Sequence, residues 1–206
     1  MPRQASKSRS PRERVLRLAL STTVLRPKDL ASIGVPREYL KRLRDEGILD
    51  HPSRGIYILA GAELTENQSL VEACKRVPQG VICLISALRF HGLTTQMPHE
   101  VWLAIGGKAW RPQITYPPLR IARFSKAALE YGVEDHRISG VNVRVYTPAK
   151  TVADCFKFRY KVGLDVALES LRDCLRKRKA SVDDIWKAAK VCRVANVMRP
   201  YLEALM

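Results

Sequence analysis

Hydrophobic residues recur every three or four positions from residue 11 to residue 47, and this spacing predicts short helices. Ser10 followed by Pro11 is a typical helix start, because Ser caps the first turn and Pro is tolerated at its first position. A second helix is expected at residues 27–34 and a third at residues 36–47. Both end at a glycine, which commonly terminates a helix.

The pattern changes to two short apolar segments after the third predicted helix. Residues 48–49 and 56–58 are expected to form two strands, and residues 51–55 the turn between them. Gly55 is expected to supply a positive φ in that turn. Three helices followed by such a hairpin are typical of a winged helix-turn-helix, whose third helix enters the major groove of DNA.

Residues 60–62, Ala-Gly-Ala, mark the predicted end of this DNA-binding domain, which spans residues 11–62. Residues 1–10 are polar and basic without apolar periodicity, so they are expected to form a disordered arm. The remaining residues, 63–206, are assigned to a second domain.

The second domain is predicted to begin with two helices, at residues 65–77 with Thr65 as N-cap and at residues 81–93 as a strongly apolar core helix. Strands are expected at residues 101–105, 120–124, 133–138 and 141–146, and the last two flank a Ser-Gly hairpin turn. From Thr147 the pattern is helical to the end, with Thr147 and Ser181 as further N-caps and Pro200 interrupting the last helix.

The predicted fold class is therefore α+β. An N-terminal winged helix-turn-helix domain precedes a mixed α/β domain with a small, mostly antiparallel sheet and a helical C-terminal end.

The net charge of the chain indicates the kind of partner that it binds. The formal net charge is +16 with a pI of about 10.0, and such an excess indicates a polyanion, most often nucleic acid. An anionic membrane surface is the competing partner. No apolar run approaches the roughly 18 residues that span a bilayer, so no membrane-spanning helix is expected. Residues 1–62 hold 13 Lys/Arg and 6 Asp/Glu, a net of +7, so the charge is densest where the DNA-binding motif is predicted.

The third predicted helix carries an exposed stripe of three cations at i, i+4 and i+7: Arg37, Lys41 and Arg44. Arginine can grip a guanine edge with two hydrogen bonds, so Arg37 and Arg44 are the predicted base readers. The predicted phosphate contacts are Lys41, Lys28 and, at the wing tip, Arg54. The alternative is that these charges form a solvated helix face.

Arg42 lies on a second stripe of the same helix with Glu38 and Asp45, and it is expected to pair with these acids.

A second basic cluster follows the helix predicted at residues 164–175, where Arg176, Lys177, Arg178 and Lys179 are consecutive. Cations at a helix C-terminus interact favourably with the helix dipole. A second contact to nucleic acid is the equally weighted alternative.

The residue patterns of common enzymes and metal sites are missing from the sequence. The 5 cysteines show no C-x-x-C spacing, so they are expected to be small buried residues in a reducing cytoplasm, and no His/Cys cluster indicates zinc. No P-loop or G-x-S-x-G elbow is present, and no lysine follows an acid by two residues as in restriction-type nucleases. We therefore expect no catalytic activity, no cofactor and no metal.

Three segments together resemble a known family. They are LRDEGILDHPSRGIYIL at residues 43–59, VICLISALRFHGLTTQMPHEVWLAI at residues 81–105, and YTPAKTVADCFKFR at residues 146–159. In this order they are similar to the AbiEi antitoxins, the regulatory half of bacterial type IV toxin–antitoxin operons.

The resemblance implies a cytoplasmic protein whose winged helix binds inverted repeats of double-stranded DNA in its own promoter and represses the operon. It implies a C-terminal antitoxin domain that counteracts a nucleotidyltransferase-like toxin, and it leaves open whether the two proteins bind directly. No membrane partner is expected, and the protein is expected to be a monomer or weak dimer. The residues themselves leave two alternatives. One is a plain transcription factor with a ligand-sensing or dimerising C-terminal domain. The other, which the missing motifs disfavour, is an enzyme such as a nuclease or an RNA-modifying protein.

Overall fold

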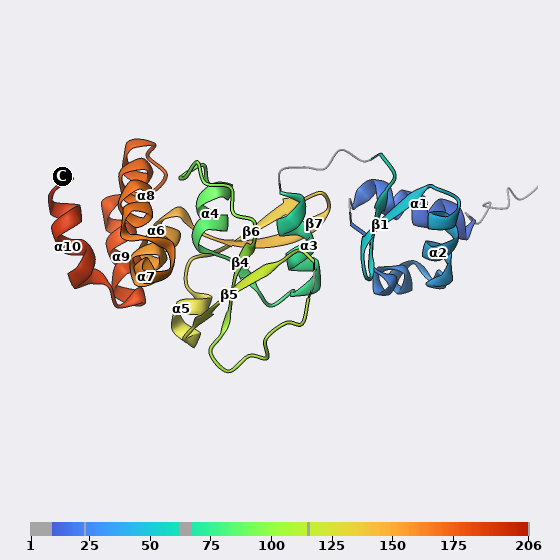
Figure 1. The fold of residues 1–206 in the computed structure, drawn as a ribbon, viewed down its shortest axis with the longest axis horizontal. Coiled ribbons are helices and arrows are strands. Elements are labelled where there is room, and N and C mark those ends of the chain that lie inside the picture. Colours follow the sequence, from blue (N-terminus) through green and yellow to red (C-terminus); the bar gives the residue numbers. More distant parts are fainter. Residues whose placement is uncertain (1–9, 23, 62–66, 115, 206) are drawn as a thin grey trace, which may run out of the picture. The chain divides into compact units, whose positions relative to one another are not determined.

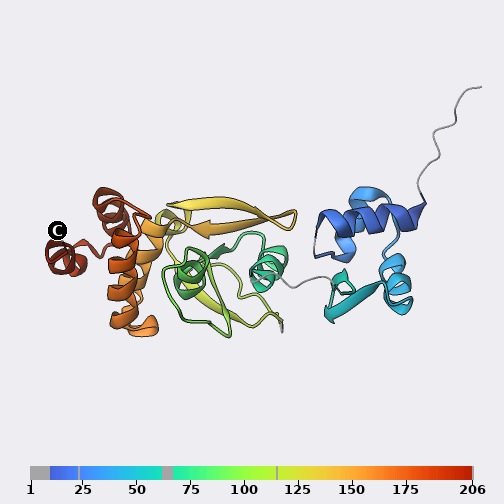
Figure 2. The ribbon, with the colours of Figure 1, turned by 90° about the horizontal axis from the view of Figure 1, so that it is seen from above.

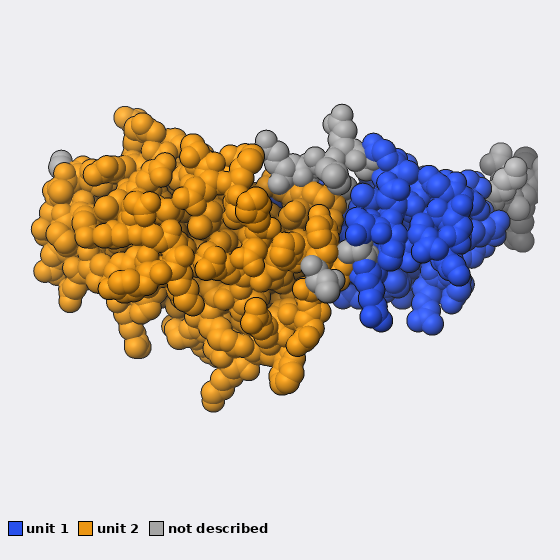
Figure 3. Space-filling view, in the orientation of Figure 1, with its two compact units in different colours: residues 1–66, 138–141 blue, residues 67–137, 142–206 orange. Residues whose placement is uncertain are grey.

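The computed structural model describes residues 10–22, 24–61, 67–114 and 116–205 (Figure 1). The chain divides into two units, coloured separately in Figure 3. The N-terminal unit comprises residues 1–66 and 138–141, and the C-terminal unit comprises residues 67–137 and 142–206. The predicted arm, apart from Ser10, lies outside the described residues, as do Ala62 and the predicted N-cap Thr65.

The N-terminal unit contains the helices and the hairpin that the sequence predicts. Its elements are α1 (Pro11–Ser21), the 3₁₀ helix η1 (Pro27–Ile33), α2 (Glu38–Asp45), β1 (Leu49–Ser53) and β2 (Ile56–Leu59). The start of α1 is confirmed: the Ser10 hydroxyl accepts from the Glu13 N–H, and the Glu13 carboxylate accepts from the Ser10 N–H. The second helix is 3₁₀, and Gly34 ends it at φ 61°.

The core of the N-terminal unit is formed by apolar side chains from all three helical segments and from β1. Leu30 of η1, Leu40 and Leu43 of α2, and Leu49 of β1 are among its buried residues. Leu25 pairs with Tyr57 of the hairpin through two backbone hydrogen bonds of 2.8 and 2.9 Å. These contacts hold α2 and the hairpin in one packed unit.

The C-terminal unit combines a sheet with helices. Its elements are α3 (Gln68–Arg76), β3 (Val81–Ile82), α4 (Leu84–Phe90), β4 (Val101–Gly106), β5 (Leu119–Phe124), α5 (Lys126–Glu130), β6 (Val133–Ile138), β7 (Val141–Tyr146), α6 (Pro148–Lys157), α7 (Arg159–Val162), α8 (Leu164–Arg176), α9 (Val182–Cys192) and α10 (Ala195–Glu203). The predicted N-caps Thr147 and Ser181 are confirmed, since each side chain accepts a backbone N–H in the first turn. Pro200 lies inside α10.

Among the described residues the sheet has five strands in the order β5-β4-β3-β7-β6. Antiparallel pairing joins β3 to β4, while β3 pairs with β7 and β4 pairs with β5 in parallel. Antiparallel pairing is thus present as expected, but the sheet is mixed. This order makes β5 an edge strand, which matters for the surface described below.

The prediction of a helix at residues 81–93 is wrong for its first residues. Val81 and Ile82 form the central strand β3, bonded to β4 on one side and β7 on the other, and only residues 84–90 are helical. Leu84 adopts φ 47°, so the backbone changes direction there. A short apolar run buried on both faces gives the same pattern in a strand as in a core helix, and the strand partners decide between them.

The C-terminal helices gather at one end of the sheet, as the orange-to-red ribbons of Figures 1 and 2 show. Helix α6 is central among them, because it packs against α4, α8 and α9. All five cysteines are free and buried, as predicted. Within the described ranges, no helix has both the length and the hydrophobicity to span a bilayer.

Candidate nucleic-acid interface

Helix α2 separates apolar from charged side chains. Leu40 and Leu43 are buried in the core of the N-terminal unit, and the charged residues of the helix lie on the remaining surface. Residues three and four positions apart share one face of a helix, so the buried pair determines which side faces solvent. Because Arg37 and Arg44 lie three and four positions from Leu40, the predicted cationic stripe flanks the buried face of α2.

The structure keeps the three predicted cations together, although α2 begins two residues later than expected. Arg37 is the N-cap residue of α2, but its φ of −60° and ψ of −25° are helical, so it continues the spacing to Lys41 and Arg44. The Arg37 side chain is 80% exposed and that of Arg44 is 39% exposed. Lys41 is exposed as well. We call these three residues the α2 face.

The ion pairs on α2 differ from the expected ones. Arg42 pairs with Glu46 at 3.0 Å. The acids that the sequence suggested for Arg42 instead pair with the two predicted base readers: Glu38 lies 3.5 Å from Arg37, and Asp45 lies 2.7 Å from Arg44.

Each of these acids is the sequence neighbour of its arginine, and the hydrogen bond from Arg44 to Asp45 raises the pKa of Arg44. Exposed pairs of this kind contribute roughly 0–1 kcal/mol, so a phosphate or a base edge can compete with them.

The hairpin and η1 present the other two predicted contacts. Arg54 is exposed in the turn between β1 and β2, beside Gly55, whose φ of 75° confirms the predicted conformation. His51 Nε2 accepts from the Gly55 N–H at 3.2 Å and stabilises this turn. Lys28 is exposed on η1. The five predicted DNA contacts thus all belong to the N-terminal unit.

The second basic cluster lies at the end of α8, and half of it is engaged in ion pairs. Arg176 and Lys177 both bond to Asp173, each at 2.7 Å, and the Lys177 ammonium also donates to the Gly92 carbonyl at 2.7 Å. The hydrogen bond from Lys177 lowers the pKa of Asp173. Arg178 and Lys179 are exposed after the helix end. Arg176 and Lys177 are therefore engaged in contacts within the C-terminal unit.

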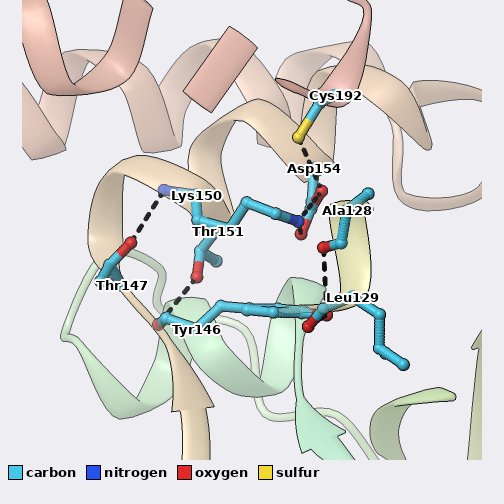
Figure 4. Close-up of polar contacts among 8 residues, drawn as sticks. All are labelled: Ala128, Leu129, Tyr146, Thr147, Lys150, Thr151, Asp154 and Cys192. Atoms are coloured by element: carbon cyan, nitrogen blue, oxygen red, sulfur yellow. Dashed lines mark hydrogen bonds and ion pairs between the residues drawn. The ribbon is translucent and has the colours of Figure 1, made fainter. Parts of the chain in front are cut away.

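A buried polar cluster on α6 is absent from the sequence predictions (Figure 4). The ammonium of Lys150 bonds to both carboxylate oxygens of Asp154, and the two side chains are 0% and 1% exposed. The Cys192 thiol donates to the same carboxylate at 3.2 Å, and the Lys150 ammonium lies 4.1 Å from the Tyr146 ring centroid.

Burial raises the pKa of Asp154 to about 6, against the opposing effect of the Lys150 ammonium. Because neither charged side chain reaches solvent, each charge depends on the other inside the packed helices, and neither is open to a ligand. A sequence signal was available: both residues stand in a helix whose other residues at 149–156 are apolar apart from Thr151.

The described part of the chain contains no group of three or more His, Cys, Asp or Glu residues that could hold a metal ion.

Comparison with known proteins identifies a family over the N-terminal unit. A family model described as "Transcriptional regulator, AbiEi antitoxin" matches residues 13–60, from α1 to the end of the hairpin. The resemblance inferred from the sequence is confirmed over this range, which contains the α2 face, Lys28 and Arg54.

The whole chain also resembles a solved structure, that of the RV2827C protein from Mycobacterium tuberculosis. The TM-score is 0.58 at 13% identity, with 99% of this chain and 83% of that chain covered. This likeness supports the fold of the chain. No curated protein matches the sequence.

Proposed function

We propose that this protein is a DNA-binding antitoxin that represses its own operon. In this proposal residues 11–62 of the N-terminal unit form a winged helix-turn-helix, with α2 as recognition helix and the β1–β2 hairpin as wing. The C-terminal part, residues 63–206, counteracts a cognate nucleotidyltransferase-like toxin. The observation that carries the proposal is the family match at residues 13–60, which coincides with the part that bears the α2 face.

The α2 face has the chemistry for reading duplex DNA. Arg37 and Arg44 can each place two donors on a guanine edge in the major groove. Lys41, Lys28 and Arg54 supply point charges for phosphates on either side. A monomer bound to each half of an inverted repeat, or a weak dimer, would fit this arrangement.

The DNA-binding part is tested with a duplex that carries the region upstream of the protein's own gene. Each bidentate contact contributes about 1–3 kcal/mol, so Arg37→Ala with Arg44→Ala is expected to weaken binding about 30-fold or more. The matched control is Arg12→Ala with Arg17→Ala, which removes the same charge from α1. Equal affinity of wild type and the α2 variant, or an equal loss in the control, would show that α2 is not the recognition helix.

The antitoxin part is tested by co-expression with the neighbouring gene. Rescue of growth by the wild-type protein, retained in the Arg37→Ala/Arg44→Ala variant, supports a toxin-counteracting role of the C-terminal part. Absence of rescue favours a plain transcription factor with a ligand-sensing or dimerising C-terminal domain.

A further inference from the structure

The C-terminal unit has a cationic groove along the edge strand β5. Four cations line it: Arg111, Arg120, Arg123 and Lys161. Glu100 and Phe158 also contribute to its wall, and its volume is about 510 Å³. We call it the β5 groove.

The charge of this groove sets it apart from the larger groove on α8. Four cations against one carboxylate give the β5 groove a formal net charge of +3. The α8 groove has a volume of about 810 Å³, and two arginines face three carboxylates there, a formal net charge of −1. The β5 groove therefore attracts a polyanion, and the larger groove does not.

Two of the arginines are held in place by the fold. One Arg123 nitrogen, Nη1, donates to the carbonyls of Gly107 and Ala109, at 2.8 and 2.9 Å. The guanidinium of Arg120 lies 4.4 Å from the Trp102 ring centroid and 3.9 Å from Glu100. All four cations of the groove remain exposed to solvent. The groove thus presents positioned donors rather than only mobile side chains.

Aromatic side chains accompany these cations. Phe158 is half-buried in the groove wall, with the Lys161 ammonium 5.6 Å from its ring centroid. Trp110 and Tyr160, which directly precede Arg111 and Lys161 in the chain, are 87% and 88% exposed. The Arg159 guanidinium lies 4.5 Å from the Tyr160 ring centroid, and both rings remain accessible to a stacking partner.

We propose that the β5 groove binds single-stranded nucleic acid, with phosphates on its four cations and bases stacked on Phe158 and the neighbouring exposed rings. Aromatic rings interleaved with cations are the common features of single-strand binding, because every base offers a face for stacking. The bases of a duplex are stacked on each other and cannot reach such rings. An acidic protein would satisfy the cations but would leave the exposed aromatic rings without a matching partner.

The test uses the full-length protein and fluorescent oligo(dT) and oligo(U) about ten nucleotides long, a length within the range of single-strand binding sites. The two probes distinguish DNA from RNA as the source of the strand. Four phosphate contacts predict that log K falls with log salt with a slope of about −2.8. Polyglutamate serves as competitor, because it carries charge without bases.

Three variants separate the contributions of phosphate contacts and of aromatic stacking to oligonucleotide binding. Arg111→Ala with Lys161→Ala should reduce the magnitude of the salt slope by about 1.4. Phe158→Leu keeps an apolar side chain but removes the ring, and should weaken binding about 5-fold or more. Trp110→Ala alters only an exposed ring, so it tests stacking without risk to folding. The charge-matched control is Lys187→Ala with Lys190→Ala, two exposed lysines of α9 outside the groove.

The proposal is supported if the groove variants lose oligonucleotide binding while the control retains it, and if the groove variants still bind the upstream duplex. The Arg37→Ala/Arg44→Ala variant should show the reverse, so failure of one proposal is distinguishable from failure of the other. The proposal is overturned if neither oligonucleotide binds, if the lysine control loses as much as the groove variant, or if polyglutamate competes as well as an oligonucleotide of equal charge.

Discussion

A base is followed four residues later by an acid both in helix α6 of the C-terminal unit and in helix α2 of the N-terminal unit, where the acid is the C-cap residue. In α2 the pair is Arg42–Glu46, with side chains 69% and 31% exposed. In α6 it is Lys150–Asp154, with side chains 0% and 1% exposed. The spacing is identical, but water surrounds one pair and is excluded from the other.

This difference in solvation decides what each pair contributes. Water already stabilises the separated charges of α2, so its pair adds little to stability and its charges are available to a ligand. In α6 each charge depends on the other, because neither can return to water when its partner is removed. The charges of the α2 pair are therefore accessible to the proposed DNA ligand, whereas the charges of the α6 pair are confined to the packed interior.

Removing one partner of the buried pair has the largest expected effect. Asp154→Ala leaves the Lys150 ammonium buried without its carboxylate and should lower the free energy of unfolding by about 3–5 kcal/mol. Urea denaturation measures this change. Glu169→Ala, at an exposed acid on α8, is the control and should stay within about 0.5 kcal/mol of wild type. A loss below about 1 kcal/mol for Asp154→Ala would remove the contrast between the two helices.

Removing both charges of the buried pair should cost less than removing one. Lys150→Met with Asp154→Val replaces the pair by apolar side chains of similar size, so no unpaired charge remains. We expect this variant to unfold within about 1–2 kcal/mol of wild type in the same denaturation experiment. If the double variant is as unstable as Asp154→Ala, the pair matters through its shape or hydrogen bonds rather than through charge.

A smaller, pH-dependent effect is expected from His91, which borders the same region. Its Nε2 lies 2.7 Å from the Tyr146 carbonyl oxygen, and burial lowers its pKa below the ordinary 6.5. The unfolded chain therefore takes up a proton more readily than the folded protein. The stability that neutral His91 contributes is present above pH 6.5, declines below that value, and is lost as the pH falls through the lower pKa of the folded state.

His91→Gln should flatten this acid sensitivity. The free energy of unfolding of both proteins would be compared at about pH 7.5 and about pH 5.5, the range in which histidine titrates. An identical decrease in the variant and in wild type would assign the acid sensitivity to other groups.

The smallest effect is expected from the exposed pair. Arg42→Ala breaks the bond to Glu46 but leaves a residue with good helix propensity, so the free energy of unfolding should change by about 0.5 kcal/mol or less. Thermal unfolding with the Glu169→Ala variant alongside measures it. A loss of several kcal/mol would mean that α2 depends on its charges as α6 does.

The two cationic surfaces differ in how far their residues lie apart in the sequence. The α2 face comes from residues 37–44 of one helix, so helical spacing alone was enough to predict it. The β5 groove brings together residues 100, 111, 119–121, 123, 158 and 161, which belong to segments that no local pattern connects. Conversely, Arg176 and Lys177 are adjacent in the sequence, but the structure pairs both with Asp173.

Several predictions depended on signals between neighbouring residues, and these were confirmed. The capping of α1 by Ser10, the end of η1 at Gly34 and the positive φ of Gly55 all follow from local backbone chemistry. The hairpin β6–β7 and the N-caps of α6 and α9 follow in the same way. Each requires only residues within a few positions of one another.

The sequence by itself thus determined where most helices and strands lie and which cations line α2, because helix spacing, caps and turns are local. Tertiary structure decided the rest. Val81 and Ile82 became a strand because β4 and β7 lie on either side of them. Lys150 and Asp154 form a buried ion pair because α4, α8 and α9 pack against α6 and exclude water from it. Strand partners, desolvation and the grouping of distant side chains depend on residues far apart in the chain, and only the packed fold brings those residues together.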